Sequence, residues 1–197
     1  MKTQFQVTDL DGWLWYNRIE DMTKEELIGR LLRTEPANEK MLMGTAWHSV
    51  LENPPDELTT IEKDGFTFQV ECNAEIILPQ VREVRANKTY FVDGVEVTLT
   101  GKVDGITGNE IDDHKLTFNS NPENYMESYQ WRAYLDIFNA DVFKYIVYSA
   151  YDNGVITIRD IYPMKVYRYP QMIADLESGI RDLLGFVKEH VPEMIKA

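Results

Sequence analysis

Two aspartates and a lysine lie close together in the segment 101–115, which reads GKVDGITGNEIDDHK. The pair Gly108-Asn109 suits a two-residue turn, so the segment is expected to form a β-hairpin. With that turn, Asp104 stands opposite Asp113, and Lys115 shares their face because side chains alternate along a strand. Two facing carboxylates repel each other, whereas a divalent cation between them removes the penalty. The hairpin therefore indicates an Mg²⁺ or Mn²⁺ site in which the Lys115 ammonium positions or deprotonates a water; a solvated face of mixed charge is the alternative.

Polar side chains in two expected helices could join this hairpin. His48 lies among apolar neighbours, with Glu52 one helical turn later. Gln130 and Tyr134 are four residues apart and therefore share one stripe of the helix that follows the hairpin. Taken alone, such a histidine packs in a core more often than it binds a ligand, and a helical tyrosine usually packs as well.

The hydrophobic periodicity of the chain predicts the helices and strands that must position these residues. Residues 1–197 show no linker or repeat and are expected to form one domain. Its expected parts are a helical N-terminal part over 1–60, strands over 66–117, a helix over 122–138, a strand pair over 142–162 and a C-terminal helix over 170–190. Thr8 is expected to cap a helix over 9–19, Thr23 to begin a capping box, and Asn121-Pro122 to start the helix that carries Gln130.

Composition and charge narrow the function classes. The 20 Lys and Arg residues against 33 Asp and Glu residues give a net charge of −13, which disfavours DNA binding by bulk electrostatics but suits a carboxylate site for cations. The densest positive group, Arg82, Arg85, Lys88 and Lys102, is expected to form a local DNA-binding strip. No apolar run is long enough to span a bilayer and no signal peptide is visible, so the expected location is the cytoplasm. The single cysteine, Cys72, excludes an internal disulfide and a cysteine-ligated iron–sulfur cluster.

Taken in order, these pieces resemble the signature of the RecB-like branch of the PD-(D/E)xK nucleases. That signature is a helical histidine in a G…H..LE setting, a G-x-x-D strand, a D-x-K strand and a Q-x-x-x-Y helix. The matching residues are Gly44, His48 and Glu52, then Gly101 to Asp104, Asp113 to Lys115, and Gln130 to Tyr134. The resemblance spans about 44–134. The sequence departs from the family pattern at Asp112 and His114, which flank Asp113, since those positions are usually apolar. Asp112 points to the opposite face of the strand, which favours Asp113 as the ligand.

The resemblance implies an α/β fold with a restriction-endonuclease-like core, a central mixed β-sheet flanked by helices. It also implies a deoxyribonuclease dependent on Mg²⁺ or Mn²⁺. Asp104 and Asp113 would hold the ions, with the carbonyl of His114 and the imidazole of His48 completing the shell. Lys115 would orient the attacking water or neutralise charge on the phosphate. The two helical residues, Gln130 and Tyr134, would contact the DNA backbone or brace the strands, and Glu71, Glu75 or Glu83 would supply a further carboxylate.

The implied partner is DNA, with no membrane, and the expected role is that of an exonuclease in phage or bacterial recombination or repair. A homo-oligomer and a single-strand annealing or recombination protein as partner stay open, as do the polarity of cleavage, its strand preference and its exonuclease or endonuclease character. Trp47 and Trp131 could stack on a separated strand, although core packing is expected for each. The alternatives are a catalytically inert nuclease-fold module that binds DNA or a protein, and an acidic DNA mimic.

Overall fold

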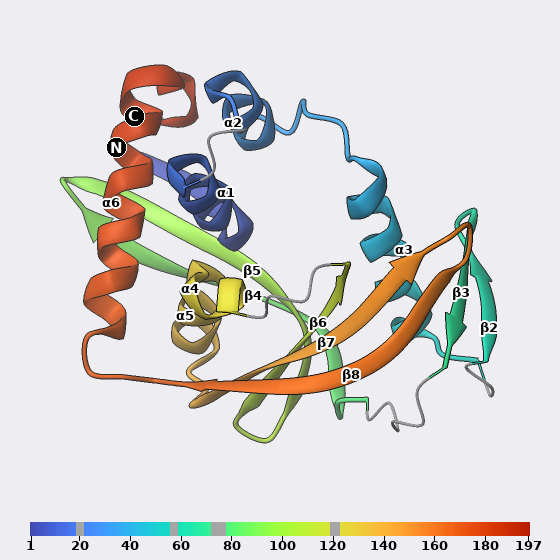
Figure 1. Ribbon diagram of the computed structural model, residues 1–197. Coiled ribbons are helices and arrows are strands. Elements are labelled where there is room, and N and C mark those ends of the chain that lie inside the picture. Colours follow the sequence, from blue (N-terminus) through green and yellow to red (C-terminus); the bar gives the residue numbers. More distant parts are fainter. Residues whose placement is uncertain (19–21, 56–58, 72–77, 119–122) are drawn as a thin grey trace.

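The computed structural model describes residues 1–197 apart from 19–21, 56–58, 72–77 and 119–122. Its described strands form one mixed sheet in the order β1-β5-β6-β7-β8-β3-β2, and β4 pairs with β5 (Figure 1). The strands are β1 (Lys2–Gln6), β2 (Thr60–Lys63), β3 (Phe66–Val70), β4 (Val81–Val92), β5 (Val95–Thr107), β6 (Glu110–Thr117), β7 (Val142–Asp152) and β8 (Ile156–Tyr167). The helices are α1 (Val7–Arg18), α2 (Lys24–Leu31), α3 (Glu39–Glu52), α4 (Glu123–Glu127), α5 (Tyr129–Phe138) and α6 (Met172–His190), followed by a short 3₁₀ turn (Pro192–Met194).

The expected hairpin is the β5–β6 pair. Its antiparallel register pairs Thr107 with Glu110 and Gly105 with Asp112, as a turn at Gly108-Asn109 requires. On its other edge β6 runs parallel to β7, so β6 is an inner strand. The hairpin thus places the D-x-K segment within the sheet instead of on a solvated surface loop.

Helices cover both faces of the sheet. The side chains of β7 alternate between two cores, one on each face. Phe143 and Tyr145 face a core shared with α1, α5 and α6. Ile146 and Tyr148 point the other way, into a second core beneath α3. Trp47 of α3 packs its ring 5.2 Å from that of Tyr148. The sheet is therefore the middle layer, and α3 approaches it from the face opposite α5.

The N-terminal part is not helical throughout, which corrects the prediction for 1–60. β1 pairs in parallel with β5, and its buried Thr3 and Phe5 alternate with exposed neighbours. The strand runs directly into α1, so Thr8 lies inside the helix and does not cap it. The Gln6 N–H instead donates to the Asp9 carboxylate at 2.8 Å, which is the reciprocal half of a capping box.

The helix expected over 122–138 is interrupted at Ser128, which corrects that prediction as well. Ser128 has extended backbone angles, and its hydroxyl accepts a hydrogen bond from the Gln130 N–H, so it begins a new helix, α5. The carboxylate of Asp11 on α1 accepts hydrogen bonds from the Ser128 hydroxyl and the Tyr129 N–H, both at 2.7 Å. A long-range contact therefore sets where α5 begins. The predicted start at Asn121-Pro122 lies outside the described residues.

The remaining elements follow the sequence closely. The capping box of Thr23 with Glu26 is present, and α3 lies within the part expected to be helical, with Asn38 as its cap. The strand pair expected over 142–162 extends to Tyr167, and the last helix begins at Met172. Among the described residues, no helix combines the length and apolar character needed to cross a bilayer.

Candidate active site

The predicted site residues converge on one cavity. It has a volume of about 250 Å³ and opens between α3, α5 and the strands β5 and β6, beside the junction of β1 with α1. Six of the side chains predicted from the sequence line it: His48, Asp104, Asp113, Lys115, Gln130 and Tyr134. The chain therefore brings together residues from four elements that are up to 86 positions apart in sequence.

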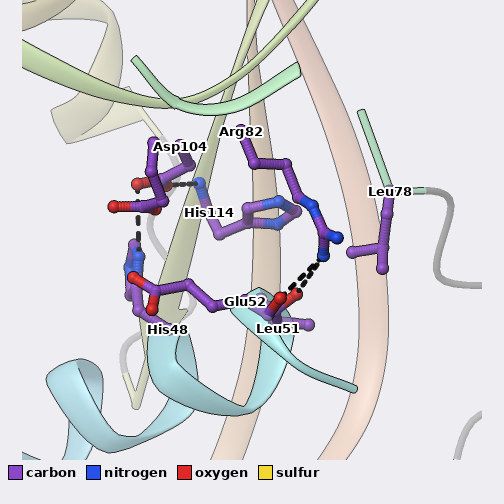
Figure 2. Close-up of a pocket in the computed structure, with 8 residues that line it drawn as sticks. His48, Leu51, Glu52, Leu78, Arg82, Asp104 and His114 are labelled. Carbon is purple, nitrogen blue, oxygen red and sulfur yellow. Dashed lines mark hydrogen bonds and ion pairs between the residues drawn. The ribbon is translucent and has the colours of Figure 1, made fainter. Parts of the chain in front are cut away.

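Asp104 lies where β5 and β6 separate, one position beyond the last hairpin pair of Gly105 with Asp112. One of its carboxylate oxygens accepts a hydrogen bond from the His114 N–H at 2.6 Å. The other lies 3.3 Å from Nδ1 of His48 on α3. Figure 2 shows both contacts, with the imidazole of His48 directed at the carboxylate.

The charges of His48 and Asp104 stabilise each other. Burial lowers the pKa of His48, but the hydrogen bond and the charge of Asp104 outweigh it and raise this pKa above its ordinary value. Burial likewise raises the pKa of Asp104, yet His48 and the more distant Lys115 hold it below its ordinary value. Asp104 is thus ionised at neutral pH and available as an anionic ligand.

Asp113 is more deeply buried, and its charge is less well compensated. Its carboxylate oxygens lie 2.7 Å from the Lys115 ammonium and 3.3 Å from the donating amide of Gln130. Burial, and to a smaller extent the charge of Asp104, raises the pKa of Asp113 to about 6 despite the opposing effect of Lys115. The two carboxylates repel each other across the cavity, as expected of facing acids.

Lys115 carries a positive charge in this site. Burial lowers its pKa, but the charges of Asp113 and Asp104 more than compensate and raise it above the ordinary value. A lysine with a raised pKa keeps its proton at neutral pH and makes a poor base. Of the two roles that the sequence suggested, positioning a water or an anion fits this environment, and deprotonating a water does not.

Gln130 and Tyr134 brace the site from α5. Gln130 donates to Asp113, while the Tyr134 hydroxyl donates to the Lys102 carbonyl at 2.9 Å. The Tyr134 ring lies against β5 at Gly101, where an added Cβ would be 2.3 Å from Cε1 of the ring. Only glycine leaves room for this contact. The glycine of the G-x-x-D strand and the tyrosine of the Q-x-x-x-Y helix therefore form one packing unit.

His114 and Asp112 belong to the other face of β6. Nδ1 of His114 lies 2.9 Å from the Tyr148 hydroxyl, and burial lowers the pKa of the imidazole to about 4, which keeps it neutral. Asp112 pairs with Lys144 at 2.8 Å, on the face away from Asp113. The predicted preference for Asp113 over Asp112 agrees with this geometry. The metal-binding role expected for the His114 carbonyl stays a prediction.

A second, smaller cavity adjoins the site on the α3 side. Its lining includes His48, Asp104 and His114, together with Glu52 and Glu83 (Figure 2). Of the three candidates for a further carboxylate, Glu83 thus lies beside the site, where it pairs with Lys102. Glu71 follows β3 and is exposed. Glu75 lies outside the described residues.

Most cations of the positive strip expected from the sequence have partners within the protein, and the strip stays a prediction. Arg82 donates to the carbonyls of Leu51 and Glu52 at the end of α3 (Figure 2). Lys88 pairs with Asp136 at 2.9 Å, and Lys102 pairs with Glu83. Three of the four cations are therefore engaged within the protein.

Both tryptophans considered for stacking are core residues. Trp47 is fully buried and Trp131 is 4% exposed, and the Trp131 indole N–H donates to the Met126 carbonyl.

Sequence reasoning missed Asp11, because its partners on α5 lie more than 110 residues away. Neither its residue type nor its spacing marks it as a positioning residue.

The donor set fits a hard divalent cation. Asp104 and Asp113 offer carboxylate oxygens, and His48 adds an imidazole nitrogen at the same cavity. Burial, and to a smaller extent the charge of Asp104, raises the pKa of Asp113, so a cation at this site would favour its ionised form. Within the described residues, no three acidic, histidine or cysteine side chains are already gathered as a ligand cluster. The Lys115–Asp113 and His48–Asp104 contacts would therefore rearrange when an ion binds.

Neither a protein-family model nor a curated protein sequence matches the chain. Solved structures are similar over almost all of it. A candidate exonuclease from Eubacterium rectale has a TM-score of 0.58 at 12% identity, covering 96% of this chain and 83% of that one. SSO0001 has a TM-score of 0.53 at 15% identity, covering 100% and 89%. LHK-Exo, an alkaline exonuclease from Laribacter hongkongensis solved in complex with dAMP, has a TM-score of 0.50 at 14% identity, covering 96% and 90%. The chain therefore shares its fold with these solved structures, and the predicted central mixed sheet flanked by helices is confirmed.

Proposed function

We propose that this protein is a deoxyribonuclease that hydrolyses phosphodiester bonds with Mg²⁺ or Mn²⁺. The observation that carries the proposal is the convergence of Asp104, Asp113, Lys115 and His48 on one cavity of about 250 Å³. Two carboxylates and a histidine can hold the metal ion of a phosphodiester hydrolase, and a protonated lysine can stabilise charge on the phosphate. The exonuclease-like fold that presents them supports the same reaction class.

Each side chain has a distinct task in the proposed reaction. Asp104, Asp113 and His48 would hold the cation, which when bound lowers the pKa of a water and stabilises negative charge on the phosphate. Lys115 keeps its proton and therefore positions the attacking water or an oxygen of the phosphate. Gln130 fixes the carboxylate of Asp113 by hydrogen bonding.

The net charge of −13 is compatible with this proposal, because the substrate need only be attracted locally. Two lysines, Lys115 and Lys102, line the cavity. A bound divalent cation would cancel the excess charge of the two aspartates. Affinity for DNA should accordingly be lower without the cation than with it.

Exonuclease action is the form of the activity that we propose, since two of the structural relatives carry that description. Recombination or repair of phage or bacterial DNA is the setting proposed with it. A catalytically inert module would share the fold, but it would not need the aspartates and Lys115 to face one cavity.

An end-labelled DNA digest tests the proposal. We expect cleavage of single- or double-stranded DNA with Mg²⁺ or Mn²⁺ and none with EDTA. Stepwise shortening from one end indicates an exonuclease, and internal fragments indicate an endonuclease. Asp104→Asn should lose cleavage, whereas Asp112→Asn, whose carboxylate pairs with Lys144 on the opposite face, should keep it. Cleavage that resists EDTA, or that Asp104→Asn retains, would contradict the proposal.

A further inference from the structure

A larger cavity lies beside the proposed catalytic cavity. It has a volume of about 460 Å³ and is enclosed by α1, α2, the segment after α2 and the first turn of α3. Gln6 and Thr8, at the junction of β1 and α1, line both cavities. The two hollows are therefore neighbours, and the larger one falls within the size range of small-molecule sites in proteins.

The lining of this larger cavity combines the apolar side chains of Trp15, Leu27, Leu31 and Met41 with five charged residues. Trp15 contributes to it and has no ring partner in the part of the chain that the structure describes. Trp13, two positions earlier, packs instead against Tyr16 and Phe186 with ring centroids 5.7 and 5.2 Å away. Met41 also lines the cavity and is 51% exposed. A partly buried indole that shares a cavity with a flexible thioether is a surface suited to a flat aromatic ligand.

The charges of the cavity disfavour an anion. Three carboxylates line it, those of Asp9, Asp11 and Glu35, against the guanidinium groups of Arg30 and Arg33. Arg33 is already held by Asp9, with two nitrogen–oxygen contacts of 2.7 and 2.8 Å. A phosphate would meet more negative than positive charge here. A neutral, planar group meets no such penalty.

We propose that this cavity binds an unpaired nucleobase of the nucleic acid whose phosphate occupies the catalytic cavity. The inference rests on the proposed nuclease function and adds to it a preference for single-stranded or frayed ends. Lys115 and the cation held by the two aspartates bind the phosphate, while Trp15 stacks on the base one cavity away. This arrangement agrees with the charges of the two cavities, since the catalytic cavity suits the phosphate of a nucleotide and the larger cavity suits its neutral base.

Binding measured without catalysis tests this inference. A fluorescein-labelled single-stranded oligonucleotide is titrated with the protein in EDTA, and fluorescence anisotropy gives Kd. Trp15→Ala should raise Kd by on the order of 5- to 150-fold, the effect of losing one base–aromatic stack. Trp15→Phe should restore most of the affinity. Phe91→Ala, which removes an aromatic side chain that is 79% exposed on β4, is the matched control and should leave Kd unchanged.

Abasic substitutions identify the base that is bound. Oligonucleotides with one abasic residue at successive positions keep the same phosphates, and one position near the cleaved end should show the loss of affinity. That loss should disappear in Trp15→Ala, because the stacking partner is already gone. Thermal melts report whether the variants are folded.

Cleavage assays separate this inference from the nuclease proposal. If wild-type protein cleaves DNA but folded Trp15→Ala binds every oligonucleotide as tightly as wild type, the base site is wrong and the nuclease proposal stands. Equal losses for all abasic positions would also overturn the base site. Wild-type protein that binds DNA through Trp15 without cleaving it supports the base site and overturns the nuclease proposal.

Discussion

Replacement of Asp113 by Asn tests the electrostatic argument for the candidate site. Asn keeps the size of the side chain and can still accept a hydrogen bond from Gln130, but it cannot ionise. Because the pKa of Asp113 is raised from 3.8 to about 6, ionisation of this group at neutral pH is less favourable in the folded protein than in the unfolded chain. In EDTA, Asp113→Asn should therefore be more stable than wild type at pH 7.

The expected gain is about 1–3 kcal/mol. The upper value is the pKa shift multiplied by about 1.4 kcal/mol per unit, and it applies only well above pH 6. The lower value allows for the opposite shift of Asp104, whose pKa is lowered and which titrates together with Asp113. Since the folded protein holds the Asp113 proton to a higher pH, wild type loses stability relative to the variant as the pH rises from about 4 to about 6. Near pH 4 the two proteins should be equally stable.

Thermal or urea melts at several pH values, each with EDTA and with Mn²⁺, measure these differences. Wild type should gain stability from Mn²⁺, because an ion that binds only the folded state stabilises it by mass action. Asp113→Asn should lose that gain together with DNA cleavage. A variant that is less stable than wild type at pH 7 in EDTA, and that responds fully to Mn²⁺, would show that Asp113 is a structural ion-pair residue and not a metal ligand.

Three further substitutions address the other parts of the site. Lys115→Ala should lower the cleavage rate by about 10²- to 10³-fold without weakening Mn²⁺ binding. The control Lys144→Ala, on the other face of the sheet, should cleave normally. A cleavage rate of Lys115→Ala within a few-fold of wild type would exclude a catalytic role for Lys115. His48→Ala should weaken Mn²⁺ affinity by on the order of tenfold or more in calorimetry. Unchanged affinity would show that His48 is a packing residue and not a metal ligand. Gly101→Ala should cost about 1–3 kcal/mol in urea melts because its Cβ meets Tyr134; the control Gly44→Ala, which meets nothing within 4 Å, should be neutral or stabilising.

The hairpin and its chemistry could be predicted from the sequence because both depend on local rules. A two-residue turn at Gly108-Asn109 fixes the register, and strand alternation then separates Asp113 from Asp112. The same kind of rule located α2 through its capping box. Where local signals agree with each other, the predicted elements match the structure to within a few residues.

The errors concern features that depend on distant partners. β1 is a short strand that exists because β5 pairs with it, and nothing within 1–60 indicates that partner. The break before α5 depends on Asp11, which is remote in sequence. The partners of the strip's cations could not be predicted for a similar reason, since the partner of Lys88 is on α5 and the partners of Arg82 are at the end of α3. A residue type shows that a cation is present, but only the fold shows whether that cation is already paired.

Asp11 connects these observations. Its carboxylate holds the start of α5, and the next residue along that helix with a polar role, Gln130, donates to Asp113. Burial raises the pKa of Asp11, yet its hydrogen bonds from Ser128 and the backbone favour the charged form. Asp11 also lines the cavity in which we place the nucleobase. The helix α1 therefore affects both proposed subsites: it lines the base site directly, and it positions Gln130 at the catalytic cavity by holding the start of α5. Because α1 moves as one unit, the packing that orients Gln130 also places the proposed base site next to the catalytic cavity.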